Sequence, residues 1–326
     1  MAISPAIQSA FDEALRLAAT FAGRTSPNPC VGAAALDSHG TILSIQAHEQ
    51  AGQLHAEANV IAELERKGLL GNAHTMVVTL EPCNHFGKTP PCADAVIRSG
   101  FKRVFVGATD PNPRVQGRGI EKLRAAGIEV IGPQEILTSD PTSQIPNRCE
   151  ELIRSFAHWS KSGLPWVTLK TALNLQGTMI PPVGQKTFTS PESLRLAHEL
   201  RRRADAILTG SGTILADQPT FTVRHISDHP VPPVGKARWL VILDRRSRVS
   251  ARYLEAAKAR GFQVHLSQGI PETLQFLGSQ GVIEVLVEAG PTLTQSFIDG
   301  GFWNQHVLIQ QKPAAPDHVS VRLHSG

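Results

Sequence analysis

The chain has 326 residues, of which 41% are hydrophobic and 18% charged, and its formal net charge is only +4. This length predicts two domains of an ordinary soluble globular protein, and the scattered Lys and Arg residues argue against a nucleic-acid-binding protein. No apolar stretch reaches the roughly 18 residues that a membrane span needs, which excludes a membrane-spanning protein.

The first half of the chain alternates between helical and extended patterns. A helix is expected to begin at Ser4-Pro5 and to end near Gly23, with Phe11 and Leu15 on its apolar stripe. Further helices are expected at 55–67, about 91–100 and 119–126, and strands at 31–36, 41–47, 75–80, 103–106 and 128–131. Strands that alternate with helices predict an α/β layered fold.

A break in this pattern separates two halves. The periodicity lapses between about 132 and 147, where Pro133, Pro141 and Pro146 cluster with Ser and Thr. We therefore expect one domain at 1–145 and a second at 146–326. In the second, strands are expected at 166–171, 206–209, 239–243, 264–266, 284–287 and 307–309, helices near 191–203, 252–260, 271–280 and 292–299, and a tail from Ala314 onward.

The four cysteines of the chain are too few for a disulfide scaffold. The N-terminus has the pattern of an amphipathic helix and lacks the basic start of a signal peptide. We therefore expect a cytoplasmic protein in which cysteines are buried or bind metal.

The strongest motif combines His55-Ala56-Glu57 with Cys83 and Cys92. A catalytic zinc site has three protein ligands and keeps a fourth position for water, whose pKa the metal lowers toward neutrality. His55, Cys83 and Cys92 are the expected ligands. Glu57 is the expected catalytic residue, which moves protons from the water to the substrate and to the leaving amine. This division of roles is typical of zinc-dependent base deaminases.

The loop between the two cysteines is unusually long, because eight residues intervene where base deaminases often have two. It carries His85 and Lys88. A lysine so near a metal site favours a contact with a substrate phosphate over a solvated loop. The sequence therefore predicts deamination of a phosphorylated amino-heterocycle.

Five motifs within residues 10–135 resemble the deaminase domain of the bifunctional riboflavin-biosynthesis deaminase/reductases. They are TSPNP at 25–29, HAE at 55–57, TLEPC at 79–83, GKTPPC at 87–92 and DPNP at 110–113. The resemblance implies a cytidine-deaminase-like three-layer α/β/α fold. It also implies hydrolysis of the 2-amino group of 2,5-diamino-6-(ribosylamino)-pyrimidin-4-one 5′-phosphate. The substrate contacts that it implies are Asn28, His48, His85, Lys88, Asp110 and Asn112.

The second half resembles the reductase domain of the same family, which is similar to dihydrofolate reductase. The matching stretches are WVTLK at 166–170, DAILTG at 205–210, GTILAD at 212–217, TVR at 222–224 and VEAGPTL at 287–293. The resemblance implies that NADPH reduces the ribose ring to ribitol. It places substrate contacts at Arg201, Phe221, Arg224 and Glu288, and NADPH contacts at Ala172, Thr213, Asp217, Gly290 and Thr292. The Gly-Pro-Thr between an expected strand and an expected helix also fits a phosphate-binding helix N-terminus.

The second half departs from the family pattern at several positions, each of which loses a carboxylate or an aromatic side chain. Gln176, Gln218, Asn304 and Gln305 stand where the family has acidic residues, and the segment 186–189 replaces Trp-Ile-Thr. The chain also stops soon after Lys312-Pro313, where most members continue. Two alternatives stay open: an active reductase, or a domain that only binds nucleotide.

Other functions remain to be weighed against this one. A specialised paralogue would use the same or a related pyrimidine in a secondary-metabolite pathway. A nucleic-acid base deaminase is disfavoured because only 5% of residues are aromatic, and a non-catalytic binding protein would not need Glu57. The expected partners are the small-molecule substrate and, by resemblance, further copies of the chain in a homodimer or homotetramer, with no nucleic acid and no membrane.

Overall fold

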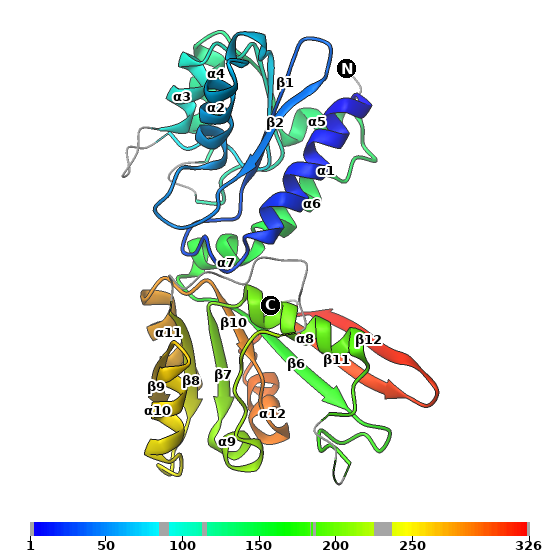
Figure 1. Ribbon diagram of the computed structural model, residues 1–326, viewed down its shortest axis with the longest axis vertical. Coiled ribbons are helices and arrows are strands. Elements are labelled where there is room, and N and C mark those ends of the chain that lie inside the picture. The colour runs from blue at the N-terminus through cyan, green and yellow to red at the C-terminus, as the bar shows by residue number, and fades with distance from the viewer. Residues whose placement is uncertain are drawn as a thin grey trace. The chain divides into compact units, whose positions relative to one another are not determined.

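The computed structural model describes residues 3–84, 91–112, 116–182, 184, 187–224 and 237–324. The chain divides into two compact units, Met1–Lys161 and Ser162–Gly326, which Figure 1 shows as two separate sheets with their own helices. Within the described residues, no helix is both long and apolar enough to span a membrane.

The first unit is built on one five-stranded sheet. The strand order is β2-β1-β3-β4-β5. Strand β1 runs antiparallel to both β2 and β3, whereas β3, β4 and β5 are parallel to one another. The strands are β1 (Gly32–Leu36), β2 (Ile42–Ala47), β3 (Thr75–Val78), β4 (Arg103–Val106) and β5 (Glu129–Ile131).

Seven α-helices and one short 3₁₀ helix accompany this sheet among the described residues. They are α1 (Pro5–Thr20), α2 (Ala56–Lys67), the 3₁₀ helix Leu70–Asn72, α3 (Cys92–Arg98), α4 (Arg118–Ala125), α5 (Pro133–Ser139), α6 (Ile145–Leu152) and α7 (Arg154–Ser162). Ser4 caps α1 by accepting a hydrogen bond from the Ile7 backbone N–H. Helix α1 also lies very close to β1, because a Cβ atom on Gly32 would be 2.2 Å from the Ala14 carbonyl oxygen.

The segment expected to be a linker contains α5 and the start of α6. Pro133 is the first residue of α5, and Pro146 lies in the first turn of α6, where proline is tolerated because the first backbone N–H groups have no helical partner. Ile145, Cys149 and Ile153 are buried in the core of this unit. The compact unit therefore extends to Lys161 rather than to residue 145.

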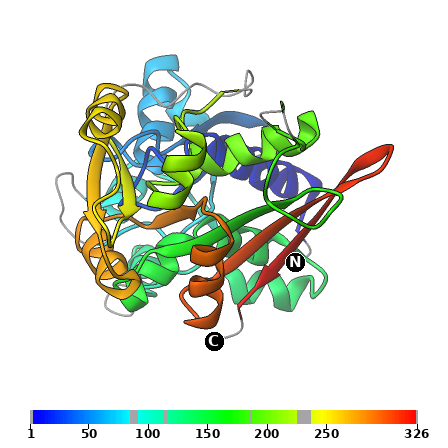
Figure 2. The same cartoon turned by 90° about the horizontal axis from the view of Figure 1, so that it is seen from below.

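The second unit holds a seven-stranded sheet with the order β12-β11-β6-β10-β7-β8-β9. All neighbouring strands are parallel except β12, which pairs antiparallel with β11. The strands are β6 (Trp166–Leu173), β7 (Ala206–Gly210), β8 (Arg238–Leu243), β9 (Phe262–Ser267), β10 (Glu284–Val287), β11 (Gln305–Lys312) and β12 (Ala315–Leu323). The prediction of a tail from Ala314 onward was wrong. This segment forms the edge strand β12, which is the red arm of the hairpin in Figure 2.

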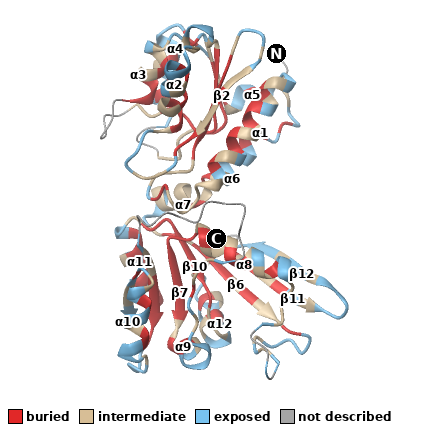
Figure 3. Ribbon diagram, in the orientation of Figure 1, coloured by how far each residue is buried: buried red, intermediate tan, exposed pale blue. Residues whose placement is uncertain are grey.

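The helices of the second unit follow its strands. They are α8 (Pro191–Arg203), α9 (Ser211–Asp217), α10 (Ala251–Ala259), α11 (Ile270–Ser279) and α12 (Pro291–Asp299). Buried residues concentrate on β7, β8 and β10, whereas β12 is largely exposed (Figure 3). The parallel strands β6, β10 and β7 lie side by side, so their carboxyl ends meet at one edge of the sheet, the usual place for a ligand site in such folds.

Candidate active sites

Three segments of the first unit bring the candidate zinc ligands together. His55 is the residue immediately before α2, Cys83 lies in the segment after β3, and Cys92 is the first residue of α3. His55 Nδ1 is 3.7 Å from Cys83 Sγ and 3.4 Å from Cys92 Sγ. The three ligand atoms all lie within 4.8 Å of one another.

These distances fit a tetrahedral zinc ion. With Zn–S bonds of about 2.3 Å and Zn–N bonds of about 2.0 Å, tetrahedral angles place the nitrogen and a sulfur about 3.5 Å apart. Both N–S distances in the structure lie close to this value. The donor set of one imidazole and two thiols also matches the ligand preference of zinc, so the residues present fit the metal.

The thiols are electrostatically coupled. Hydrogen bonds from the Cys92 thiol and backbone N–H and from His55 lower the pKa of Cys83, although burial opposes them. The neighbouring Cys83, burial and Glu57 raise the pKa of Cys92. The two sulfurs therefore oppose each other's ionisation, and a bound cation would favour the thiolate form of both. Metal binding is expected to release a proton.

Glu57 lies beside the candidate ligands, on the first turn of α2. Its side chain is only 3% exposed, and burial raises the pKa of Glu57 to about 7 while the charge on His55 opposes the shift. A buried carboxyl group next to a metal site is suited to accept and return protons.

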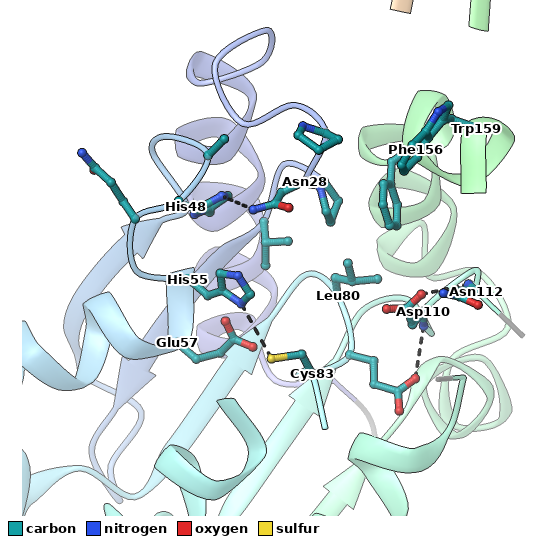
Figure 4. A pocket seen from close by; sticks show the side chains of 17 residues that line it. Asn28, His48, His55, Glu57, Leu80, Cys83, Asp110, Asn112, Phe156 and Trp159 are labelled. Atoms are coloured by element: carbon teal, nitrogen blue, oxygen red, sulfur yellow. Dashed lines mark hydrogen bonds between the residues drawn. The ribbon is translucent and has the colours of Figure 1, made fainter. Parts of the chain in front are cut away.

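A cavity of about 620 Å³ opens onto Glu57, His55 and Cys83, within the usual size range for small-molecule sites. Figure 4 shows His55, Glu57 and Cys83 grouped together, with Asn28 and His48 beside them. His48 Nδ1 faces the Leu54 carbonyl oxygen at 2.9 Å and must therefore carry the proton, so its Nε2 accepts from the Asn28 amide at 3.1 Å. The Asn28 oxygen is thereby turned away from His48, free to accept a hydrogen bond from a ligand.

Two further predicted contacts, Asp110 and Asn112, also line this cavity. Asp110 Oδ1 accepts a hydrogen bond from the Asn112 backbone N–H at 2.8 Å. The structure thus brings four of the six predicted deaminase substrate contacts to one cavity. The other two, His85 and Lys88, lie outside the described residues.

Glu81 is a buried residue to which the sequence analysis assigned no role. Its carboxylate accepts four backbone hydrogen bonds, from Asp110 (3.1 Å), Gly117 (2.9 Å), Gly119 (2.8 Å) and Ile120 (3.2 Å). It therefore caps α4, whose N-cap residue Gly117 has no side chain, and anchors the segment of Asp110. Its place in TLEPC, between a buried strand and a ligand, was the only signal in the sequence.

Gly119 is needed for this arrangement. A Cβ atom there would lie 2.0 Å from the Pro82 carbonyl oxygen. The absence of a side chain lets α4 approach closely enough for its first backbone N–H groups to reach Glu81.

We expect Glu81→Ala to destabilise the first unit by at least about 2 kcal/mol, because buried backbone N–H groups lose their acceptor. Amide hydrogen exchange at Gly117, Gly119 and Ile120 should become faster, and Glu81→Gln should have a smaller effect because the amide keeps one oxygen. Unchanged exchange and an unchanged denaturation midpoint in Glu81→Ala would contradict this role.

In the second unit, a charged cluster lies at the carboxyl ends of β6 and β10. Glu288 forms a two-point ion pair with Arg201, with Oε2 2.8 Å from Nη2, and lies 3.3 Å from Lys170 Nζ. The Arg201 guanidinium stands 5.9 Å from the centre of the Phe221 ring, within the range of a cation–π contact. The structure thus brings together the three predicted substrate contacts Arg201, Phe221 and Glu288. Lys170, which the sequence analysis quoted only as part of the WVTLK motif, also belongs to this cluster.

The other predicted substrate and NADPH contacts of the second unit do not take part in the Glu288 ion pairs. Arg224 donates its backbone N–H to His198 Nδ1 and its guanidinium to the Thr220 and Thr222 hydroxyls, so it does not join the Glu288 ion pairs. Thr213 Oγ1 accepts from the Gly290 backbone N–H at 3.1 Å, which joins the starts of α9 and α12. Two predicted cofactor contacts, Asp217 and Thr292, are exposed, and Ala172 lies near the end of β6.

Two departures from the family pattern have structural roles here. Asn304 Oδ1 accepts from the Val167 backbone N–H at 2.8 Å and so ties the start of β11 to β6. Gln176 is exposed in a turn that Asn174 holds, since Asn174 Oδ1 accepts from the backbone N–H groups of Gln176 and Thr178. Neither replacement removes a charge from the Glu288 cluster.

The buried ion pairs of Glu288 predict a pH-dependent stability. Burial alone would raise the pKa of Glu288, but Lys170 and Arg201 outweigh it and lower the pKa to about 2. The ionised form thus stabilises the fold above the ordinary pKa of 4.5, and this contribution is lost as the pH falls toward 2.

We therefore expect Glu288→Gln to destabilise the second unit by about 3 kcal/mol at pH 7, and by clearly less at pH 3. Denaturant unfolding at the two pH values measures the difference, with Glu255→Gln on the exposed surface of α10 as the control. An equal loss of stability at both pH values would be inconsistent with this charge network.

Comparison with known proteins gives matches over both units. Residues 5–108 match the cytidine and deoxycytidylate deaminase zinc-binding region, and residues 165–311 match the RibD C-terminal domain. The chain is 38% identical over 320 residues to riboflavin biosynthesis protein RibD of Aquifex aeolicus, covering 91% of this chain and 84% of the relative. It is 35% identical over 319 residues to RibD of Bacillus amyloliquefaciens, covering 90% and 81%.

Solved structures give the same result. The Thermotoga maritima diaminohydroxyphosphoribosylaminopyrimidine deaminase/5-amino-6-(5-phosphoribosylamino)uracil reductase superposes with a TM-score of 0.78 at 30% identity, covering 95% of this chain and 88% of that chain. Acinetobacter baumannii RibD gives a TM-score of 0.77 at 28% identity, with the same coverage. These matches confirm the predicted α/β fold class of both units.

Proposed function

Because this chain belongs to the RibD family of riboflavin-biosynthesis deaminase/reductases, we propose that it performs both reactions of that family. The first unit hydrolyses the 2-amino group of 2,5-diamino-6-(ribosylamino)-pyrimidin-4-one 5′-phosphate and releases ammonia. The second unit reduces the ribose of the deaminated product to ribitol with NADPH. The observation that carries the proposal is the clustering of His55, Cys83 and Cys92 beside a cavity that His55, Cys83 and Glu57 line.

The residues of the first unit divide the deamination chemistry among them. Bound zinc, held by His55, Cys83 and Cys92, supplies the Lewis acidity that lets a water attack at neutral pH. Glu57 takes one proton of that water and delivers it to the ring nitrogen. It then moves the second proton, from the hydroxyl group now on carbon 2, to the amino group, which leaves as ammonia. The Asn28 oxygen accepts a hydrogen bond from the polar edge of the ring.

The deaminase step has a direct test. Purified protein with stoichiometric zinc is mixed with the diaminopyrimidinone ribosyl phosphate, and ammonia is measured. We expect ammonia to appear in step with loss of the substrate absorbance. A zinc-loaded protein that releases none would refute the proposal.

The reductase proposal is supported by the Glu288 cluster. Lys170 and Arg201 carry two positive charges against the single negative charge of Glu288, and this net charge suits a phosphorylated sugar. We place the phosphates of NADPH at the start of α12, near Gly290 and Thr213. Calorimetric titration with NADPH tests the site, and a Thr213→Val variant should bind more weakly if that placement is right.

Two further points belong to the proposal. The riboflavin pathway is favoured over a secondary-metabolite pathway, because the relatives named for riboflavin biosynthesis match about nine-tenths of this chain. Full rescue of a riboflavin auxotroph by the gene would support this choice.

We also propose that the chain assembles into a homodimer or homotetramer. Light scattering of the purified protein tests this assembly.

A further inference from the structure

Two aromatic side chains of α7 line the deaminase cavity, although no motif of the sequence points to them. Phe156 and Trp159 border the same cavity as His55, Glu57 and Cys83. Their ring centres are 6.3 Å apart and their planes are inclined by 42°. Figure 4 shows them on the side of the cavity opposite His48, with Phe156 near Leu80 and Asp110.

These rings do not serve the hydrophobic core of their unit. Among the described residues, the core cluster includes Ile153, just before α7, but neither Phe156 nor Trp159. Both side chains are half-buried, and Ser155 is the buried residue of α7. Aromatic rings that border a cavity can contact a ligand bound in it.

Different groups line the two sides of the cavity. Asn28, His48, His55 and Glu57 lie on one side, and the rings of Phe156 and Trp159 lie on the other, where Asp110 and Asn112 also border it. A flat heterocycle can contact both sides, since its edge carries hydrogen-bonding groups and its faces are apolar π-surfaces. Enzymes that act on bases commonly hold them by edge contacts together with stacking on aromatic side chains.

We propose that Phe156 and Trp159 form an aromatic wall against which the pyrimidine ring of the substrate packs, so that α7 is a specificity element of the deaminase. This proposal rests on the proposed function. The wall would hold the ring plane while Asn28 holds its edge, which fixes the carbon bearing the 2-amino group at the metal. Contacts to the ring face persist from ground state to transition state, so the wall should act mainly on KM.

The first test is a kinetic comparison of full-length, zinc-loaded variants. Loss of aromatic stacking on a base typically weakens binding by about 5- to 150-fold. We expect Phe156→Leu and Trp159→Leu each to raise the deaminase KM by that factor with little change in kcat, because leucine keeps bulk but loses the flat ring. Phe156→Tyr and Trp159→Phe should restore a KM close to that of the wild type.

Matched controls separate the wall from general effects on folding. Lys161→Ala changes an exposed residue of the same helix, and Phe276→Leu changes a half-buried aromatic of the second unit. Both should keep the wild-type KM. Unchanged KM in both leucine variants, alongside normal ammonia release by the wild type, would overturn the wall.

A second test is independent of turnover. The chain has four tryptophans, and Trp159 is the one within the first unit. In a Glu57→Gln background, titration with the diaminopyrimidinone ribosyl phosphate should quench the Trp159 fluorescence, and the additional change Trp159→Phe should remove that quench. A quench that survives Trp159→Phe would contradict the wall even if ammonia release failed, so the two proposals can fail separately.

Discussion

Replacing Glu57 by glutamine should abolish ammonia release while the protein keeps its zinc. General acid–base catalysis by one positioned group contributes about 10²- to 10⁴-fold to a rate, and Glu57 is assigned every proton transfer of the deamination. Glutamine has nearly the same shape and can fill the same buried position, but it cannot accept the proton of the attacking water. The deaminase kcat should therefore fall by at least about 100-fold.

The comparison needs the metal content of each preparation. Zinc is measured per chain by mass spectrometry of the metal, and ammonia by an enzyme-coupled assay. Glu63→Gln is the matched control, because Glu63 lies on the same helix and pairs with Arg66 and Lys67 at the surface. Wild-type activity in a zinc-loaded Glu57→Gln protein would overturn the assigned mechanism.

Removal of one candidate ligand is expected to abolish both zinc retention and deamination. In Cys83→Ser or Cys92→Ser, the metal keeps two of its three protein ligands. Loss of an outer-shell partner alone typically weakens metal affinity by 10- to 100-fold, so loss of a direct ligand should weaken it by more than about 100-fold. Deaminase activity should fall in parallel with the zinc content.

The control for this experiment is a cysteine outside the ligand set. Cys30 lies 3.4 Å from the Thr25 hydroxyl and is not within the cluster of ligand atoms, so Cys30→Ser should keep one zinc per chain. Treatment of the wild type with a chelator should remove activity, and added zinc should restore it. Full activity in metal-free protein would rule out the zinc mechanism.

Much of the fold could be predicted from the sequence because its signals are local. The helix at Pro191–Arg203 and the strands at Arg103–Val106 and Glu284–Val287 lie where they were expected. Helix caps, apolar periodicity and β-branched runs act over a few residues and can be recognised without a structure. The α/β class of both units is confirmed by the comparisons.

The errors in the fold have two physical causes. The prolines near residue 140 were interpreted as a linker, but Pro133 and Pro146 lie in the first turns of α5 and α6, where proline is favoured or tolerated. The strand β12 was missed because it is exposed at the sheet edge and lacks a clear alternation of buried and exposed residues.

The candidate zinc ligands were recognisable because one short motif carries each of them. The roles of Glu81, Lys170, Phe156 and Trp159 depend on contacts between distant segments. Glu81 binds backbone groups 29 to 39 residues away, and Phe156 reaches the cavity from a helix that the sequence pattern did not indicate. The spacing of residues along the sequence cannot predict contacts between such distant segments.

The central claim is that the two units perform consecutive reactions, and one assay tests it most directly. Wild-type protein, NADPH and the diaminopyrimidinone ribosyl phosphate are combined, and ammonia release and NADPH oxidation are followed together. We expect both, with ammonia appearing first. Glu57→Gln should show neither with this substrate, yet should oxidise NADPH when given the deaminated product. NADPH oxidation by Glu57→Gln with the diamino substrate, or none by the wild type with the deaminated product, would contradict the account.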